Sequence, residues 1–401
     1  MLTSISSNEN VIEGERSHIV QTYNRPPFVL MGGKGVTVYD ADGNSYTDWV
    51  SGIAVNSLGY GDAELTKAIG QAINTGLIHT SHLYHTVPHV DLATILCESS
   101  FADRVFFCNS GTEAVEGAIK FARRVAYNKG LTHKTEIVGC SGAFHGRTMG
   151  SLALTPRDHF QEQFKPLMPS TAQIEFNNLE SARVAIGENT AAVIVEPVQG
   201  HGGIHVATNE FLRCLRELCD EYDAMLIIDE VQCGLGRTGK LWAYEWSGVT
   251  PDMMTLAKPL AGGLPMGAIL VTNEVGDNIK PGDHCSTFAG GPVVSSAAKV
   301  VVNRVTQPQF LEHVSEVGQY LVERLMEIDS PLIKDIRGQG LMIGLELTIE
   351  AIQLVNAAHD YGLLLVGAGS HVIRLVPPLI IDKRHVDHLV DCLTEILRDF
   401  E

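Results

Sequence analysis

The chain has 401 residues, 45% of them hydrophobic and 19% charged, which is ordinary for a globular protein and long enough for two domains. Its 47 acidic side chains outnumber its 29 basic ones, and the net charge of -18 argues against a general nucleic-acid-binding protein, which needs a basic face. The eight cysteines form no CxxC pair, residues 1–18 lack the apolar core of a signal peptide, and no stretch approaches the roughly 20 apolar residues of a membrane span, so we expect a cytoplasmic protein.

The first elements in chain order are a hairpin and then alternating strands and helices. Residues 35–49 predict a β-hairpin, because two alternating runs flank an Asp-Gly-Asn turn. A helix is expected at 112–128 and another at 209–222. Short apolar runs stand at 137–140, 191–197, 224–231, 253–258 and 267–271. Continuously apolar strands that alternate with helices indicate an α/β fold, with a mostly parallel sheet flanked by helices in a large domain.

The pattern changes near residue 295, where two long helices, 293–306 and 309–328, precede a strand-rich end. We interpret this end as a smaller α+β domain to which both ends of the chain contribute. The predicted division is an N-terminal segment at 1–60 that belongs to the small domain, a large domain at 61–290, and the small C-terminal domain at 291–401.

An acid and a lysine follow two neighbouring apolar runs. Asp229 ends AMLIIDEV, and Lys258 ends MMTLAK just before a proline, which disfavours a helix at that point. Ligands of parallel α/β sheets bind at the carboxyl ends of the strands, where both side chains are expected. An ordinary ion pair at a sheet edge is the alternative, because structural charge networks also occur there.

Two further segments follow strands. Ser110, Gly111 and Thr112 open a helix after VFFC, where backbone N–H groups and hydroxyls could hold a phosphate, although a simple N-cap would have the same residues. Phe144 and Arg147 lie after IVGC and place an aromatic ring beside a cation. A loop with a buried phenylalanine and a solvated arginine is the alternative there. Each segment alone is weak evidence for a site.

Taken together, the motifs resemble one family. The segments FFCNSGTEAVEGAIKFAR, FHGRT, EPVQG, IIDEVQCGLGRTG, LAKPLAGGLPMGA and STFAGGP occur in the order and spacing of the class III aminotransferases, and the resemblance extends over nearly the whole chain. It implies the fold-type-I architecture, pyridoxal 5'-phosphate as cofactor, and the acetylornithine and 4-aminobutyrate aminotransferase group as the nearest members. It further implies a role in amino-acid biosynthesis, including that of arginine.

The resemblance assigns the cofactor site. Lys258 would hold the cofactor as a Schiff base and then move the proton as a base, which requires that its amine be partly neutral. Asp229 would pair with the pyridine nitrogen, and Gln232 would bond the phenolic oxygen. Phe144 would stack on one face of the ring, and Val231 would press on the other. Metal is not implied.

The phosphate would be shared between two subunits. Ser110, Gly111 and Thr112 would hold it from one subunit, and Thr287, in STFAGGP, would reach it from the other. The resemblance therefore implies a homodimer with shared active sites, whose other partners are small amino and keto acids.

Two arginines would bind substrate carboxylates, because the planar guanidinium can form two parallel hydrogen bonds with a carboxylate. Arg147 would bind the carboxylate remote from the reacting amine, and Arg374 the α-carboxylate of glutamate. For Arg374, a strand residue paired with a surface acid is the alternative.

The sequence departs from the family pattern at His201, where the family has a glutamate that neutralises Arg374 while an ω-amine reacts. A histidine has an ordinary pKa of about 6.5, so we expect His201 to accept a hydrogen bond from Arg374 when neutral and to repel it in mildly acid solution.

The substrate best matching the resemblance is N2-acetylornithine with 2-oxoglutarate and glutamate as the partner pair; ornithine, 4-aminobutyrate and diaminobutyrate are alternatives. A rival from another class is an NTP-binding module, because Gly234–Lys240 fits GxxxxGK, but Leu241 stands where a P-loop needs Ser or Thr. Four histidines at 79, 82, 85 and 89 favour a polar segment near the mouth of the site over a zinc site, which would need a closed ligand set.

Overall fold

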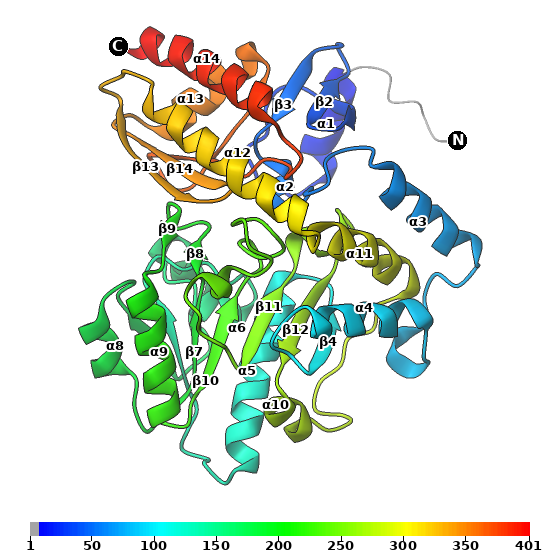
Figure 1. The fold of residues 1–401 in the computed structure, drawn as a ribbon, viewed down its shortest axis with the longest axis vertical. Helices are drawn as coiled ribbons and strands as arrows, with labels where there is room; N and C mark the ends of the chain where they lie inside the picture. Colours follow the sequence, from blue (N-terminus) through cyan, green and yellow to red (C-terminus); the bar gives the residue numbers. More distant parts are fainter. Residues whose placement is uncertain (1–7) are drawn as a thin grey trace.

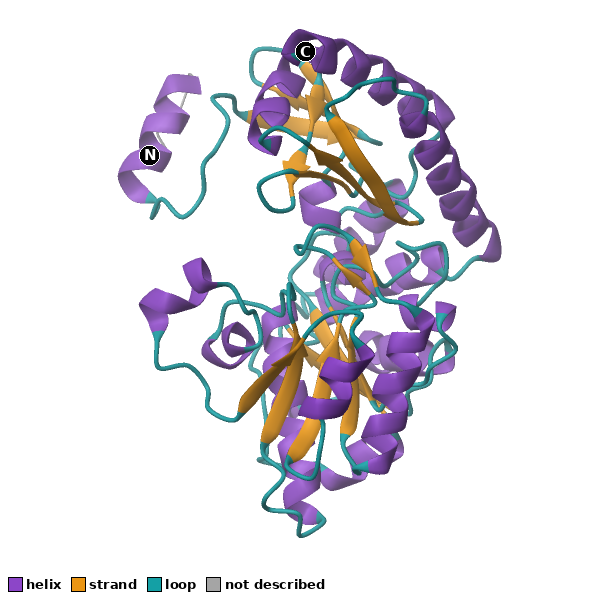
Figure 2. Ribbon diagram, turned by 90° about the vertical axis from the view of Figure 1, so that its left-hand side faces the viewer, coloured by secondary structure: helices purple, strands orange, loops and turns teal. Residues whose placement is uncertain are grey.

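The computed structural model describes residues 8–401, which form two lobes, each built around its own sheet (Figures 1 and 2). Within the described residues the larger lobe holds a seven-stranded sheet in the order β4-β12-β11-β10-β7-β5-β6. Its strands are β4 (Arg104–Cys108), β5 (Glu136–Cys140), β6 (Thr171–Ile174), β7 (Thr190–Val195), β10 (Met225–Asp229), β11 (Met253–Leu256) and β12 (Gly267–Val271).

Alternating side chains of these strands enter two different cores. In β10, Leu226 and Ile228 belong to the hydrophobic cluster on one face of the sheet, whereas Met225 and Ile227 belong to the cluster on the other. Successive side chains of a strand point to opposite faces, so a sheet covered on both faces needs apolar residues at every position. The uninterrupted apolar runs of the sequence have this origin, and the predicted α/β class is confirmed.

One strand of the large sheet is reversed. β12 is antiparallel to both β11 and β4, whereas the strands β11, β10, β7, β5 and β6 run parallel to one another. A parallel connection needs a crossover of a dozen or more residues, and the short link from Leu256 to Gly267 allows only a return in the opposite direction. The sheet is therefore mostly parallel, as predicted, with the reversal directly after Lys258.

Helices of the large lobe pack on both faces of the sheet. The longest of them is α5 (Gly111–Asn128), which carries Ala114, Ala118 and Val125 into the core it shares with β12. The others are α3 (Ala63–Asn74), α4 (Val87–Glu98), α6 (Met149–Ala153), α7 (Asp158–Gln161), α8 (Leu179–Ala185), α9 (Asn209–Glu221), α10 (Asn273–Asn278) and the connecting α11 (Pro292–Val305). Short strands β8 (Val198–Gln199) and β9 (His205–Val206) pair on the side facing the smaller lobe.

The smaller lobe combines both ends of the chain (Figure 1). The predicted hairpin forms β2 (Thr37–Asp40) and β3 (Ser45–Asp48), with β1 (Leu30–Lys34) beside β2 and β15 (Leu363–Leu364) parallel to β3. Val36 and Trp49 lie in one hydrophobic core with residues of the C-terminal third. Of the predicted N-terminal segment 1–60, residues 1–7 lie outside the described part of the chain.

The second sheet of this lobe has the order β13-β14-β17-β16. Its strands are β13 (Ile333–Gln339), β14 (Met342–Leu347), β16 (Val366–Gly367) and β17 (Val372–Leu375), and the helices of the lobe are α1 (Asn8–His18), α2 (Ser51–Ala54), α12 (Pro308–Met326), α13 (Ala351–Ala358) and α14 (Lys383–Phe400). No helix among residues 8–401 is both long and apolar enough to cross a membrane.

Candidate active site

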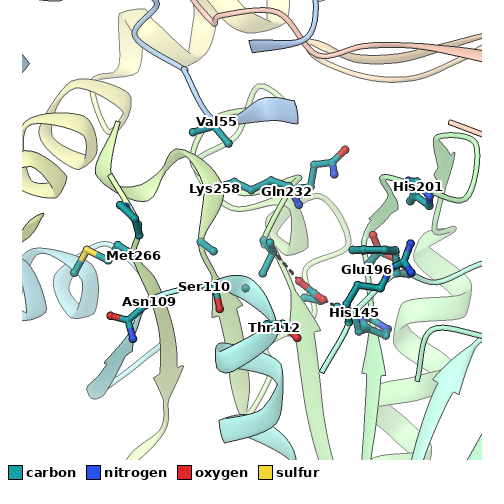
Figure 3. A pocket seen from close by; sticks show the side chains of 18 of the residues that line it. Val55, Asn109, Ser110, Thr112, His145, Glu196, His201, Gln232, Lys258 and Met266 are labelled. Carbon is teal, nitrogen blue, oxygen red and sulfur yellow. Dashed lines mark hydrogen bonds and ion pairs between the residues drawn. The ribbon is translucent and has the colours of Figure 1, made fainter. Parts of the chain in front are cut away.

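A cavity of about 430 Å³ opens where the carboxyl ends of β10 and β11 meet the start of α5 (Figure 3). The predicted site residues that line it are Ser110, Gly111, Thr112, Phe144, Arg147, His201, Asp229, Val231, Gln232 and Lys258. These residues come from five separate segments of the chain, which the sheet brings to one place. Arg374 lies directly behind Gln232, whereas Thr287 is exposed and outside this cavity.

The sheet places the acid and the lysine at the same edge. Asp229 is the last residue of β10 and pairs in register with Thr255 of the parallel strand β11. Lys258 follows β11 closely and opens a 3-10 turn over Lys258–Ala261 with a positive φ of 36°. Such a conformation is strained for a residue with a side chain, and strain of this kind concentrates at functional sites.

The carboxylate of Asp229 has a buried histidine as its partner. Nδ1 of His145 lies 2.7 Å from Oδ2 of Asp229, and the backbone N–H of Val231 donates to Oδ1 at 3.0 Å. The histidine side chain is fully buried, and its Nε2 has no hydrogen-bond partner. Burial alone would lower the pKa of His145, but the hydrogen bond and charge of Asp229, with the charge of Glu196, raise it.

Sequence reasoning did not select His145, although it lies within the FHGRT motif. The signal that could have found it was its position beside Phe144, after β5, because polar residues that follow parallel strands converge on the site. The neighbouring Glu196, which follows β7 and lines the cavity, was missed in the same way.

Lys258 has an environment that favours the neutral amine. Burial lowers its pKa most, and the positive charge of Arg374 lowers it further. The negative charges of Asp229 and Glu196 act in the opposite direction without reversing the shift. A lysine with a lowered pKa is a better nucleophile and base than one free in water.

The start of α5 forms a pocket for an anion. The side chain of Ser110 caps the helix by accepting from the backbone N–H of Glu113. The hydroxyl of Thr112 lies 2.8 Å from that of Thr148 and 2.7 Å from that of Ser151. A Cβ at Gly111 would come within 2.7 Å of Val231, so only glycine lets the helix start approach that side chain. Free N–H groups and the helix dipole favour a phosphate at such a position.

Arg374 belongs to β17 of the smaller lobe and lies behind Gln232, which lines the cavity. It is only 2% exposed, and its Nη1 donates to the carbonyl of Gly200 at 2.7 Å and to Oε1 of Gln232 at 3.3 Å. Its Nε is buried without a partner. Burial lowers its pKa to about 10, which leaves the guanidinium charged at neutral pH. The alternative of a strand residue paired with a surface acid is therefore excluded by its burial.

The second arginine lies on an aromatic wall. The guanidinium carbon of Arg147 is 3.3 Å from the ring centre of Phe160 and 5.8 Å from that of Phe144. The ring of His201 lies 4.9 Å from Phe144 and 5.9 Å from Phe160. Cations over aromatic faces are attracted by the ring quadrupole, which holds Arg147 at the rim of the cavity.

The expected titration of His201 near neutrality is wrong. Burial lowers its pKa to about 3, with further contributions from Arg374, Arg157 and Arg147. The imidazole is therefore neutral throughout the physiological range. No hydrogen bond joins it to Arg374 among the described residues; Arg374 instead binds the carbonyl of Gly200. The sequence could not reveal this, because the burial and the surrounding cations come from distant segments.

The segments considered above as a nucleotide-binding loop and as a zinc site make other contacts in the structure. Lys240, in the GxxxxGK segment, donates to the carbonyl of Glu245 and lies over the ring of Trp246 at 4.5 Å. It does not line the cavity. In the histidine-rich segment, His82 and His89 pack edge to face against each other, and residues 8–401 contain no group of side chains arranged to hold a metal ion.

The residues present fit pyridoxal 5'-phosphate. A lysine amine with a lowered pKa, a carboxylate and an aromatic ring line the same cavity, and an anion pocket opens at the helix start. Any side chain at position 111 would fill the space between the helix start and Val231. The fold and this site define a fold-type-I aminotransferase whose cofactor is pyridoxal 5'-phosphate.

Comparisons with known proteins agree with this class. The family model for class III aminotransferases matches residues 19–397, and the chain belongs to this family. A mitochondrial acetylornithine aminotransferase of Alnus glutinosa is 48% identical over 97% of this chain and 88% of its own length.

Solved structures agree on the fold. An ornithine aminotransferase of Toxoplasma gondii superposes with a TM-score of 0.95 at 28% identity, over 99% of this chain and 96% of that one. An N-acetylornithine aminotransferase of Stenotrophomonas maltophilia does so with a TM-score of 0.84 at 33% identity, over 97% and 99%.

Proposed function

We propose that this aminotransferase moves the δ-amino group of N2-acetylornithine to 2-oxoglutarate, in the cytoplasm and in the biosynthesis of arginine. The observation that carries the proposal is the pair of guanidinium groups at the cavity, Arg147 on its aromatic rim and Arg374 behind Gln232, with Lys258 at the cavity floor. Two carboxylate-binding groups suit a donor and an acceptor that each carry a carboxylate away from the reacting carbon.

The aromatic wall favours an acylated donor. If Arg147 holds the α-carboxylate of the donor, the neighbouring α-nitrogen would lie close to a second cation, because the guanidinium carbons of Arg147 and Arg157 are 3.3 Å and 5.9 Å from the centre of the same Phe160 ring. A free α-ammonium, as in ornithine, would be repelled by these cations, whereas an acetamide is neutral and packs against Phe160 and His201. Ornithine, 4-aminobutyrate and diaminobutyrate remain the alternative donors.

We assign the cofactor contacts as follows. Lys258 would hold the cofactor covalently, Asp229 would pair with its ring nitrogen, and Gln232 would bond its phenolic oxygen. Phe144 and Val231 would cover the two faces of the ring. When bound, pyridoxal 5'-phosphate serves as an electron sink for the carbon that loses a proton.

The phosphate is assigned to Ser110, Gly111 and Thr112 of one subunit and Thr287 of the other, in a homodimer with shared sites. The exposure of Thr287 outside the cavity of its own chain supports this assignment. The residue before it contacts the loop between β4 and α5, because Asn109 Nδ2 donates to Ser286 Oγ at 2.9 Å. We also retain the division into 1–60, 61–290 and 291–401 as the proposed domain limits.

The side chains of this chain perform the proton transfers. The amine of Lys258, whose pKa burial lowers, would take a proton from the reacting carbon of the substrate and, once protonated, would return it as the general acid. The carboxylate of Asp229 is fixed in position by His145 and the N–H of Val231. Arg374 and Arg147 orient the substrate so that the reacting carbon faces Lys258.

The donor assignment is tested with a matched pair. With 2-oxoglutarate as acceptor, kcat/KM for N2-acetylornithine is expected to exceed that for ornithine by at least about tenfold, since the unfavourable charge contact that ornithine would make costs on the order of 1.4 kcal/mol. Initial rates of glutamate formation give both values, with 4-aminobutyrate and diaminobutyrate in the same series. A higher kcat/KM for any of the three unacylated donors would overturn the assignment.

The shared site predicts complementation between inactive subunits. Lys258→Ala and Thr287→Ala proteins, unfolded and refolded together, should form mixed dimers in which one site carries both changes and the other neither. Activity should return toward that of a single intact site, whereas each variant refolded alone stays impaired. If mixed dimers confirmed by mass spectrometry show no gain over the sum of the two parents, Thr287 does not act across the interface.

A further inference from the structure

Arg237 is a buried arginine that lies outside the cavity, in the loop that follows β10 of the large lobe. Its side chain is 1% exposed, and its Nη2 has no hydrogen-bond partner among residues 8–401. Burial lowers its pKa to about 9, and no carboxylate in the described part of the chain raises it, so the guanidinium is charged at neutral pH. A buried charge without a counter-charge is costly. The hydrogen bonds that Arg237 does form therefore need an explanation.

The side chain of Arg237 binds backbone carbonyls of the smaller lobe. Its Nη1 donates to the carbonyl of Leu341 at 3.0 Å and to that of Pro377 at 2.6 Å. Its own carbonyl accepts from the N–H of Leu341 at 3.0 Å. The two backbones are in direct contact here, because a Cβ at Gly340 would come within 2.5 Å of the carbonyl carbon of Thr238. Three hydrogen bonds of one residue thus join the two lobes.

The two carbonyls belong to the segments that flank Arg374. Pro377 follows Arg374 by three positions, just after the end of β17. Leu341 directly precedes β14, which pairs with β17 so that Gly344 lies opposite Arg374. Strands joined by a ladder of hydrogen bonds keep their register. Arg237 therefore fixes the position of the strand pair that carries Arg374.

The loop that carries Arg237 also carries Gln232, which lines the cavity (Figure 3). The two ends of this loop are held together, because the buried carboxylate of Glu230 accepts from two successive backbone N–H groups. They are those of Ala243 at 2.8 Å and Tyr244 at 2.7 Å. A loop closed in this way holds Arg237 and Gln232 in a constant arrangement relative to the large sheet.

We propose that Arg237 is a positioning residue that sets where Arg374 stands relative to Gln232, by joining the loop of the one to the strand pair of the other. Arg374 Nη1 lies 3.3 Å from Oε1 of Gln232, so a displacement of β17 would move the guanidinium at the cavity. The inference rests on the proposed function, in which Arg374 binds the α-carboxylate of glutamate. Arg237 acts only through Arg374 and lines no part of the cavity itself.

The test compares two half-reactions of the same holoenzyme, one with glutamate and one with N2-acetylornithine, each followed by the absorbance of the bound cofactor in stopped flow. Arg237→Lys keeps the charge, but one ammonium group cannot reproduce the fixed geometry of the guanidinium. Its kcat/KM for glutamate should fall at least about tenfold, because a misplacement of about 1 Å can cost 100-fold. Its kcat/KM for N2-acetylornithine, whose carboxylate is assigned to Arg147, should stay within about threefold.

The matched control is Arg123→Lys. Arg123 also donates to two backbone carbonyls, those of Thr135 at 2.9 Å and Pro169 at 3.1 Å, but both belong to the large lobe. Both half-reactions of this variant should stay within about threefold of the wild type. Arg237→Gln, which leaves no buried charge, gives the same comparison if the lysine variant does not fold.

A loss confined to glutamate, at the cofactor occupancy of the wild type, is the result expected. A merely structural role would lower both half-reactions alike, so an equal loss would overturn the proposal, and so would unchanged rates with glutamate. Failure of the wild type to react with N2-acetylornithine would remove only the donor assignment. The ω-amino donor that the wild type does accept would then take its place in the same comparison.

Discussion

Replacing Lys258 with alanine is expected to lower turnover with every donor by at least about 10³-fold, since a positioned acid–base group alone contributes 10² to 10⁴ and the covalent link is lost as well. The amine of Lys258 lies at the cavity floor with a lowered pKa, and no other lysine lines the cavity. Steady-state rates and the visible absorption of the bound cofactor measure the two losses separately.

The matched control is Lys240→Ala. This lysine ends the GxxxxGK segment, contacts Trp246 and lies away from the cavity, so turnover should change by less than about threefold, as for a surface substitution. Reduction of the wild type with borohydride and peptide mapping should place the label on Lys258. A label on a different lysine, or full activity of Lys258→Ala, would remove Lys258 from the reaction.

Much of the large lobe follows from its sequence pattern. The strands of a sheet buried on both faces read as unbroken apolar runs, so β7, β10, β11 and β12 could be located within a few residues. Helix α11 begins at Pro292 and α12 at Pro308, each one residue before its predicted start, because proline suits the first helical turn. The reversal of β12 was not predicted, because an apolar run does not indicate whether its strand is parallel or antiparallel to its neighbours.

A site residue could be predicted from the sequence where it follows a strand and where its own side chain, without a partner, indicates a chemical role. Asp229 and Lys258 met this condition, and their placement at adjacent strand ends is confirmed. His145 did not, because its importance depends on a contact with Asp229, 84 positions away. The pKa of His201 was predicted wrongly for a related reason: its burial and four neighbouring cations come from segments that only the fold assembles.

The second large effect is expected at Asp229. Asp229→Asn keeps the shape of the side chain but removes its charge, and turnover should fall by at least about 10²-fold, since a preorganised charge contributes several kcal/mol to a buried reaction centre. The carboxylate also raises the pKa of His145, so the neutral amide is expected to lower the pKa of that histidine. Single-turnover rates with excess donor report this step, free of product release.

His145→Gln provides the contrast, because it leaves the carboxylate of Asp229 charged and removes only the side chain that orients it. A positioning partner of this kind is expected to cost roughly tenfold to 100-fold, as for outer-shell residues that orient a ligating group. The two variants are compared by their loss of turnover at equal cofactor occupancy. If the charge at position 229 matters most, Asp229→Asn must turn over more slowly than His145→Gln. Near-normal turnover of Asp229→Asn would show that the site draws its charge from another residue, and Glu196, which lines the same cavity, would be the next to change.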